Sequence, residues 1–287
     1  MEIGKRFDDI VLYNENMRMS IQDKLYFIRY LPDNFVYTFV DFGCADGSLL
    51  NTLCGLLRLE KHSAMKYIGY DCSEEMISLA KSRFQGEISD DIVFTNSWGD
   101  IENELSKKRS EKEKVVLILS SVIHEVYSYA KKPQDLLDFW YNQVLRPGFD
   151  YIVIRDMIAD EDYTSPAPKE LVESVQWNSG LGLMFADFTK RWVPDISKIS
   201  IKDILHYLLK YRWKVNWQRE LNENYFPVTT KELLDIILDP CLNNKYKLEY
   251  WERFRVKFLD EKFLEDFGIN LGDYGYNTHV KAIFKKR

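Results

Sequence analysis

A glycine-rich turn flanked by acidic residues is the first feature of the sequence that could do chemistry. The stretch 40–48 reads VDFGCADGS, and its smallest residues let the backbone approach a ligand closely: Gly43, Ala45 and Gly47. The helix predicted to follow offers unpaired amide hydrogens and the positive end of its dipole. A bound phosphate would meet the carboxylates of Asp41 and Asp46. The turn therefore favours a cationic ligand.

Asp71 is a second acidic residue in a position suited to ligand binding. It lies 28 residues after Gly43, at the end of a predicted strand, and this spacing fits one intervening helix and strand. A carboxylate there can accept hydrogen bonds from both hydroxyls of an adenosine ribose, as in other nucleotide-binding sheets. The alternative is that Asp71 only caps a helix or a turn.

His124 is the best candidate for a general base, because histidine is the side chain whose ordinary pKa lies near neutrality. It follows the predicted strand 115–119, in the segment LSSVIHEVYSY. Glu125 could orient His124 or bind a cationic acceptor. In the alternative interpretation, His124 only packs against, or hydrogen-bonds to, a neighbouring loop.

The cysteines and histidines do not indicate a metal site or a disulfide framework. The four cysteines form no C-x-x-C pair, and none of the four histidines lies at helical or finger spacing from another. We therefore predict no metal ligand and expect reduced thiols.

Composition limits the classes of partner. The 287 residues carry 39 Lys and Arg against 45 Asp and Glu, a net charge of -6, which gives no general reason to bind nucleic acid or an anionic membrane. The longest strongly apolar run, 115–123, is too short to span a bilayer, and the N-terminus has no signal-peptide pattern. We expect a cytoplasmic protein that does not enter a membrane.

Predicted strands and helices alternate through the first half of the chain, which indicates a mostly parallel sheet. The predicted strands are 37–42, 65–71, 91–94, 115–119 and 151–155, and the predicted helices are 8–31, 49–59, 73–84 and 133–145. The alternation stops after residue 156. Residues 157–228, with a clear helix only at 201–211, are predicted to form a cap over the carboxyl ends of the strands. A helix from Thr229 or Thr230 to 237 and strands at 247–258 and 278–284 complete the chain.

Several motifs in this order resemble the class I S-adenosylmethionine-dependent methyltransferases. That family typically carries acidic-x-Gly-x-Gly-x-Gly after its first strand, and residues 41–47 read DFGCADG, with Ala45 in place of the middle glycine. Asp71 and the segment 71–80 match the acidic end of the second strand and the helix after it. Residues 96–100, NSWGD, fall where the family holds the adenine. Residues 145–154 look like its Leu-x-Pro-Gly-Gly turn, with Phe149 in place of one glycine.

The resemblance covers about residues 38–156 and the closing strands. Dehydrogenases and P-loop enzymes fit less well, because G-x-G-x-x-G and the P-loop lysine are missing. The resemblance implies one domain whose seven-stranded, mostly parallel Rossmann-like α/β sheet has helices on both faces. We expect this single domain to consist of an N-terminal helical segment (1–37), a donor-binding core (38–156), an inserted helical cap (157–228) and a closing helix and strands (229–287).

The resemblance also implies S-adenosylmethionine as methyl donor and S-adenosylhomocysteine as product. The donor-binding candidates are Asp41, Gly43, Ala45, Asp46, Gly47, Asp71, Cys72, Met76, Ser97, Trp98 and Ser120. His124 and Glu125 are the catalytic candidates, and Tyr13, Arg155 and Asp156 are candidates for the acceptor side.

The acceptor is left open between two classes. An aromatic-rich cap favours a small molecule methylated on oxygen or nitrogen. RNA is the alternative, because residues 190–219 carry eight basic residues against two acidic ones, interleaved with five Trp and Tyr residues. A third possibility is a non-catalytic binding subunit, against which the intact set of Gly43, Gly47 and Asp71 argues. The sequence leaves the oligomeric state open.

Overall fold

The computed structural model describes residues 21–59, 66–83, 91–107, 110–178, 180–239 and 245–287, and they include a single seven-stranded sheet. The strand order is β3-β2-β1-β4-β5-β7-β6. Strands β1 to β5 run parallel, and β7 is antiparallel to both of its neighbours. Their bounds are Val36–Phe42 (β1), Lys66–Tyr70 (β2), Ile92–Thr95 (β3), Glu113–Ser120 (β4), Tyr151–Met157 (β5), Tyr246–Phe254 (β6) and His279–Lys286 (β7). The predicted α/β sheet is confirmed.

Helices cover both faces of this sheet, and each face has its own apolar core. On one face, the core joins the strands to α5 (Trp98–Ser106), α6 (Ile123–Tyr129), the π-helical segment η2 (Asp138–Leu145) that continues α7 (Pro133–Leu137), and α12 (Thr230–Leu238). On the other, it joins them to η1 (Tyr26–Tyr30), α3 (Ser48–Leu59) and α4 (Glu74–Arg83). Strand β4 is buried from Val115 to Ser120 without alternation, as expected for a strand covered on both faces.

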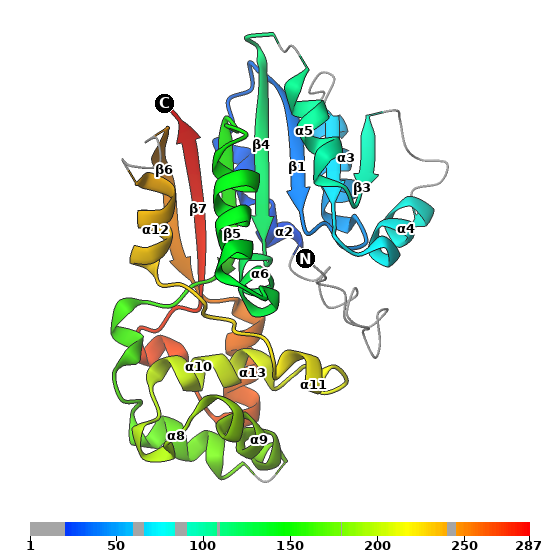
Figure 1. Cartoon of the computed structure of the whole chain (residues 1–287). Coiled ribbons are helices and arrows are strands. Elements are labelled where there is room, and N and C mark those ends of the chain that lie inside the picture. Colours follow the sequence, from blue (N-terminus) through cyan, green and yellow to red (C-terminus); the bar gives the residue numbers. More distant parts are fainter. Residues whose placement is uncertain (1–20, 60–65, 84–90, 108–109, 179, 240–244) are drawn as a thin grey trace.

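The cap lies beyond the carboxyl ends of β1 and β4 (Figure 1). Its elements are η3 (Glu161–Thr164), α8 (Lys169–Gln176), α9 (Gly182–Trp192), η4 (Ile196–Lys198), α10 (Ile201–Lys210) and α11 (Trp217–Glu220). They surround a third apolar core centred on α10, whose residues are nearly all buried. Ligands of open parallel sheets bind at the strand ends, so the cap faces the edge where a site is expected.

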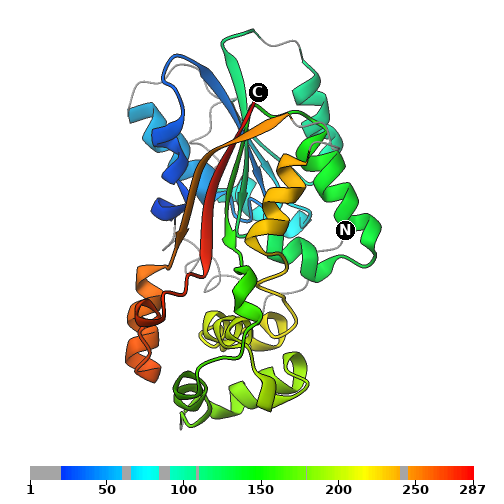
Figure 2. The ribbon, with the colours of Figure 1, turned by 90° about the vertical axis from the view of Figure 1, so that its left-hand side faces the viewer.

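The structure corrects two predicted elements. Residues 255–258 do not continue a strand, because β6 ends at Phe254 and a helix, α13 (Lys257–Phe267), begins after Val256. Its side chains Phe263 and Phe267 pack into the apolar core of the cap, as does Leu271 of η6 (Leu271–Tyr274). The connection between β6 and β7 therefore adds to the cap layer, as Figure 2 shows from the side.

The second correction concerns the predicted helix 8–31. Residues 8–20, including the acceptor-side candidate Tyr13, lie outside the described residues. The remainder is the short helix α2 (Ile21–Lys24) followed by the 3-10 helix η1. None of the helices in the described residues is long and apolar enough to cross a membrane.

Gly43 provides a test of the turn after β1. Its φ is +77°, and a Cβ atom added there would lie 2.7 Å from Cγ2 of Val122. Replacing Gly43 by Ala should therefore lower the free energy of unfolding of the unliganded protein by about 2 kcal/mol or more, measured by chemical denaturation.

Gly55→Ala is the matched control. Gly55 lies on the exposed side of α3 with no atom within 4 Å of an added Cβ. That variant should gain about 0.5–1 kcal/mol, because alanine is the better helix former. Equal stability of the two variants would mean that the turn does not need glycine.

Candidate active site

The turn after β1 is tied to the end of β2 by backbone hydrogen bonds. The amides of Gly43 and Cys44 both donate to the carbonyl oxygen of Tyr70, at 2.8 and 2.9 Å. Gly43, Ala45 and Gly47 all have positive φ, of +77°, +46° and +74°. The predicted glycine-rich turn is thus a sequence of left-handed residues, with Ala45 in a conformation that glycine adopts more readily.

Asp71 lies beside this turn and is held by it. Its Oδ2 accepts the amide of Ala45 at 3.0 Å, and its Oδ1 accepts the amide of Ser73 at 2.9 Å. Burial raises the pKa of Asp71 to about 6, against the effect of these two hydrogen bonds. Each oxygen keeps a second lone pair, so the carboxylate can still accept two hydroxyl groups.

The two acidic residues of the turn differ in their surroundings. Asp41 is buried, and burial raises its pKa to about 7, although the nearby Lys24 opposes the shift. Asp46 caps α3 by accepting the amide of Ser48 at 3.0 Å, and its other oxygen pairs with Arg83. The contacts of Asp46 are therefore those of a helix cap.

The remaining donor-site candidates follow β2, β3 and β4. Cys72 is half-buried beside Asp71, Met76 is buried in α4, and Ser97 is exposed before α5. Two of the candidates have buried polar atoms with no hydrogen-bond partner among the described residues, Trp98 Nε1 and Ser120 Oγ.

Asp156 at the end of β5 organises the catalytic candidate His124. Its Oδ1 lies 2.9 Å from His124 Nδ1, and its Oδ2 accepts the amides of Val122 and Ile123 at 2.8 and 2.7 Å. Oδ1 also accepts the amide of Met157 at 2.8 Å. The sequence placed Asp156 only on the acceptor side. The structure shows that it is fully buried and orients His124.

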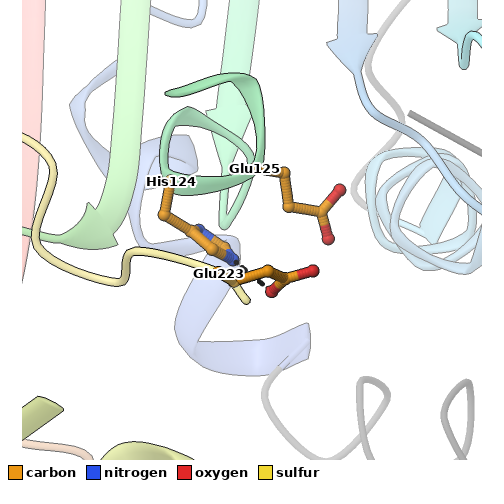
Figure 3. A group of neighbouring side chains, drawn as sticks. All are labelled: His124, Glu125 and Glu223. Carbon is orange, nitrogen blue, oxygen red and sulfur yellow. Dashed lines mark ion pairs between the residues drawn. The ribbon is translucent and has the colours of Figure 1, made fainter. Parts of the chain in front are cut away.

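Glu125, which was predicted to orient His124 or to bind a cationic acceptor, lies near the imidazole and acts on it through its charge. Figure 3 shows that it leaves α6 to one side of the imidazole. Its Oε1 pairs with Arg219 of the cap at 3.0 Å. Consecutive residues of a helix point about 100° apart, so the side chains of His124 and Glu125 leave α6 in different directions.

The pKa of His124 is shifted upward. Burial alone would lower it, but the charge of Asp156 and its hydrogen bond favour the imidazolium and outweigh burial. The same contacts keep the pKa of Asp156 below its ordinary value despite complete burial. Because the ionised Asp156 accepts from Nδ1, the second ring nitrogen, Nε2, faces the cap.

Glu223 is a site residue that the sequence did not predict. Its Oε2 lies 3.9 Å from His124 Nε2 (Figure 3). Its Oε1 accepts the hydroxyl of Tyr129 at 2.8 Å and pairs with Arg219 at 2.9 Å. His124, Glu125 and Glu223 offer three potential metal-ligand atoms within 4.8 Å of one another. Glu223 lies 99 residues after His124 in a polar loop, so only the folded cap brings the two together.

A cavity of about 210 Å³ opens between the strand ends and the cap. Its polar wall includes Ser121, His124, Glu125, Arg155, Arg219, Glu220 and Glu223, and its apolar wall includes Met157, Leu209, Trp213, Tyr225, Phe258 and Leu259. Arg155, a predicted acceptor-side residue, lines the cavity, but its guanidinium is already bonded to Asp23 at 3.1 Å and to Ser121 at 3.0 Å.

Three of the five rings of the basic aromatic stretch 190–219 are part of the interior of the cap, and Trp192 and Trp213 are half-buried. Tyr207, Tyr211 and Trp217 are buried in its core, so these rings offer no surface on which bases could stack. Lys210 is fully buried and donates to the backbone carbonyl groups of Glu220 and Glu223.

Residues 36–195 match the family described as methyltransferase domain. A cyclopropane synthase from Mycobacterium tuberculosis is similar in structure, with 11% identity, 95% of this chain and 85% of that chain covered, and a TM-score of 0.47. A SAM-dependent methyltransferase from Aquifex aeolicus has 11% identity, 96% of each chain covered and a TM-score of 0.45. No curated protein matches the sequence.

The contact between Asp156 and His124 makes a measurable prediction. In Asp156→Asn the largest of the charges that oppose burial is gone and only Glu125 and Glu223 remain, so the pKa of His124 should fall below its wild-type value, observed by NMR titration of its imidazole protons. The resonances of His206 and His279, which are not bonded to Asp156, serve as internal controls. An unchanged pKa of His124 would show that Asp156 does not set its charge.

Proposed function

The chain belongs to the methyltransferase domain family, a family of class I S-adenosylmethionine-dependent enzymes, and we propose that it methylates an oxygen or nitrogen atom of a small-molecule acceptor. The observation that carries the proposal is the cavity under the cap, which is lined by His124 and lies directly at the ends of β4 and β5. A site of this kind holds one small acceptor next to a fixed base.

The donor is proposed to lie across the turn after β1, with its ribose on Asp71. The two remaining lone pairs of Asp71 and the positive φ values at Gly43 and Gly47 support this. The unpaired Trp98 Nε1 and Ser120 Oγ also support a ligand at the strand ends, because a buried polar atom without a partner costs about 1–3 kcal/mol. S-adenosylmethionine supplies an electrophilic methyl group and its own leaving group, so the protein mainly positions the reactants.

His124 is proposed to accept the proton that the acceptor loses. The hydrogen bond to Asp156 keeps the proton on Nδ1 and leaves the lone pair of Nε2 toward the cavity. The same carboxylate stabilises the imidazolium that results. The burial of Tyr207, Tyr211 and Trp217 favours a small molecule over RNA as the acceptor.

Asp71 provides the first test. Asp71→Asn should weaken the binding of S-adenosylhomocysteine about tenfold or more, measured by calorimetry, because charged hydrogen bonds to the ribose are lost. In the wild-type protein the affinity should be constant above about pH 6 and fall below it, where Asp71 becomes protonated.

Asp187→Asn is the control for this experiment. Asp187 lies on α9 and pairs with Lys190 at the surface, at 3.6 Å. Its replacement should leave the affinity unchanged. Equal affinity in Asp71→Asn and the wild-type protein would rule out Asp71 as the ribose ligand.

His124→Gln tests the base. The rate of S-adenosylhomocysteine formation with an acceptor, found among small amines and alcohols, should fall about 10²–10⁴-fold. The wild-type rate should rise with pH through a pKa above 6.5, because only neutral His124 can take a proton. The variant should bind S-adenosylhomocysteine normally and lack this pH dependence. A variant with the wild-type rate and pH profile would remove His124 from the mechanism.

A further inference from the structure

Two hydrogen-bond acceptors face each other across the cavity. Asp156 holds one proton of His124 on Nδ1, so Nε2 presents a lone pair whenever the imidazole is neutral. Glu223 uses Oε1 to accept from Tyr129 and Arg219, which leaves Oε2 directed at His124 Nε2, 3.9 Å away. His124 is 6% exposed and Glu223 1% exposed, so water outside the cavity does not solvate this pair. Two acceptors in such a position favour a group that donates to both of them.

The cluster also carries more negative than positive charge. Glu125, Glu220 and Glu223 all pair with the single guanidinium of Arg219, at 3.0, 2.8 and 2.9 Å. The other two arginines of the cavity have acidic partners of their own.

Those partners are Asp23, 3.1 Å from Arg155, and Asp266, 4.0 Å from Arg212. When Glu223 is ionised, the three carboxylates around Arg219 meet at most two cations, because the second one is the buried amine of Lys210 beside Glu220 and Glu223, and burial lowers its pKa to about 7. A cationic ligand would balance the remaining charge.

The pKa values of His124 and Glu223 also reflect the excess of negative charge around them. Burial and the neighbouring carboxylates Glu220 and Glu125 raise the pKa of Glu223 to about 8, and Asp156 raises that of His124. The pair therefore holds an extra proton near neutral pH. A cationic group of a ligand that binds between His124 and Glu223 would take the place of that proton.

An ammonium group fits this position better than a metal ion does. Atoms 3.9 Å apart can both lie about 2.8–2.9 Å from one nitrogen, the usual length of a charged hydrogen bond. A divalent ion would bring the carboxylates of Glu125 and Glu223 to about 2.0–2.2 Å. The guanidinium of Arg219 already occupies the space beside both of them.

One side of the cavity is apolar and aromatic, and there the guanidinium of Arg212 lies over the ring of Phe258, 5.0 Å from its centroid. Leu209, Trp213, Phe258 and Leu259 line it beyond the charged cluster. The ring of Tyr225 stands edge to face with the imidazole of His124, with ring centroids 5.1 Å apart. Aromatic walls suit both the apolar body of a ligand and its cationic end.

We propose that the acceptor is an amine with an apolar body, which binds as an ammonium between His124 and Glu223. This inference rests on the proposed methyltransferase function and specifies its substrate class. One proton of the ammonium passes to His124 Nε2, and the freed lone pair forms the new N–C bond. The C–S bond of the donor breaks with its electron pair left on sulfur, which yields the N-methylated ammonium and S-adenosylhomocysteine, and His124 then releases the proton to water.

Calorimetry on the protein saturated with S-adenosylhomocysteine tests the inference. The probes are benzylamine, phenethylamine and hexylamine, each paired with the alcohol of the same carbon skeleton. At least one amine should bind about tenfold more tightly than its alcohol, because only the ammonium can donate to both acceptors with a charge. With S-adenosylmethionine, mass spectrometry should show methylation of that amine and not of the alcohol.

The variant Glu223→Gln tests the contribution of the carboxylate charge of Glu223, because it replaces that carboxylate by a neutral amide of similar shape. It should lower the affinity for the amine about tenfold and leave that for the alcohol within about twofold. Glu173→Gln on α8, which removes a surface carboxylate paired with Lys169, should change neither. If Glu223→Gln fails to bind S-adenosylhomocysteine and is therefore misfolded, Glu125→Gln takes its place with the same expectation.

The outcomes separate the two proposals. Failure of the wild-type protein to bind S-adenosylhomocysteine would overturn the proposed function. Normal binding of S-adenosylhomocysteine, with no amine bound more tightly than its alcohol, would overturn only the amine inference. Binding of Mn²⁺ or Zn²⁺ that is lost in Glu223→Gln would also overturn it, in favour of a metal at this cluster.

Discussion

The carboxylate of Asp156 is the contact on which the geometry of the site depends. It is fully buried at the end of β5, yet it accepts three backbone amides and the imidazole of His124. The amides of Val122 and Ile123 belong to the turn after β4, so one side chain fixes both where that strand ends and how α6 begins. Because the amides and the imidazole all favour its ionised form, burial does not neutralise it. The direction of His124 Nε2 follows from this.

The cap completes the site from residues far away in the sequence. Arg219 and Glu223 come from the segment around α11, and Lys210 comes from the end of α10. Their contacts with Glu125, Tyr129 and His124 place charged groups between the sheet and the cap, where one large apolar interface would otherwise form. A polar interface of this kind sets the register of the two layers. It also keeps a cavity open at the strand ends, because charged side chains there cannot collapse as apolar ones would.

The parts of the molecule that the sequence predicted are those determined locally. Alternating strands and helices predicted the sheet, and the small residues of the stretch 40–48 predicted a tight turn at the end of the first strand, where the structure has positive φ at Gly43 and Gly47. Glu223 could not be predicted, because its role comes from a contact across 99 residues. The rings of residues 190–219 suggested a binding surface, because the sequence does not show that Tyr207, Tyr211 and Trp217 pack into the core around α10. The start of helix α13 was missed because apolar and basic residues still alternate after β6 ends, from Phe254 to Phe258, as they would in a strand.

The buried carboxylates of the cluster place a cost on the unliganded fold. Folding raises the pKa of Glu223 from its ordinary value of 4.5 to about 8, so between these values the folded protein binds more protons than the unfolded chain. The free energy of unfolding contributed by Glu223 therefore falls as the pH rises through this range. A cation bound between Glu223 and His124 would take over the role of the extra proton and remove that loss. The fold thus retains a group that weakens it near neutral pH, as expected where a site is prepared for a charged ligand.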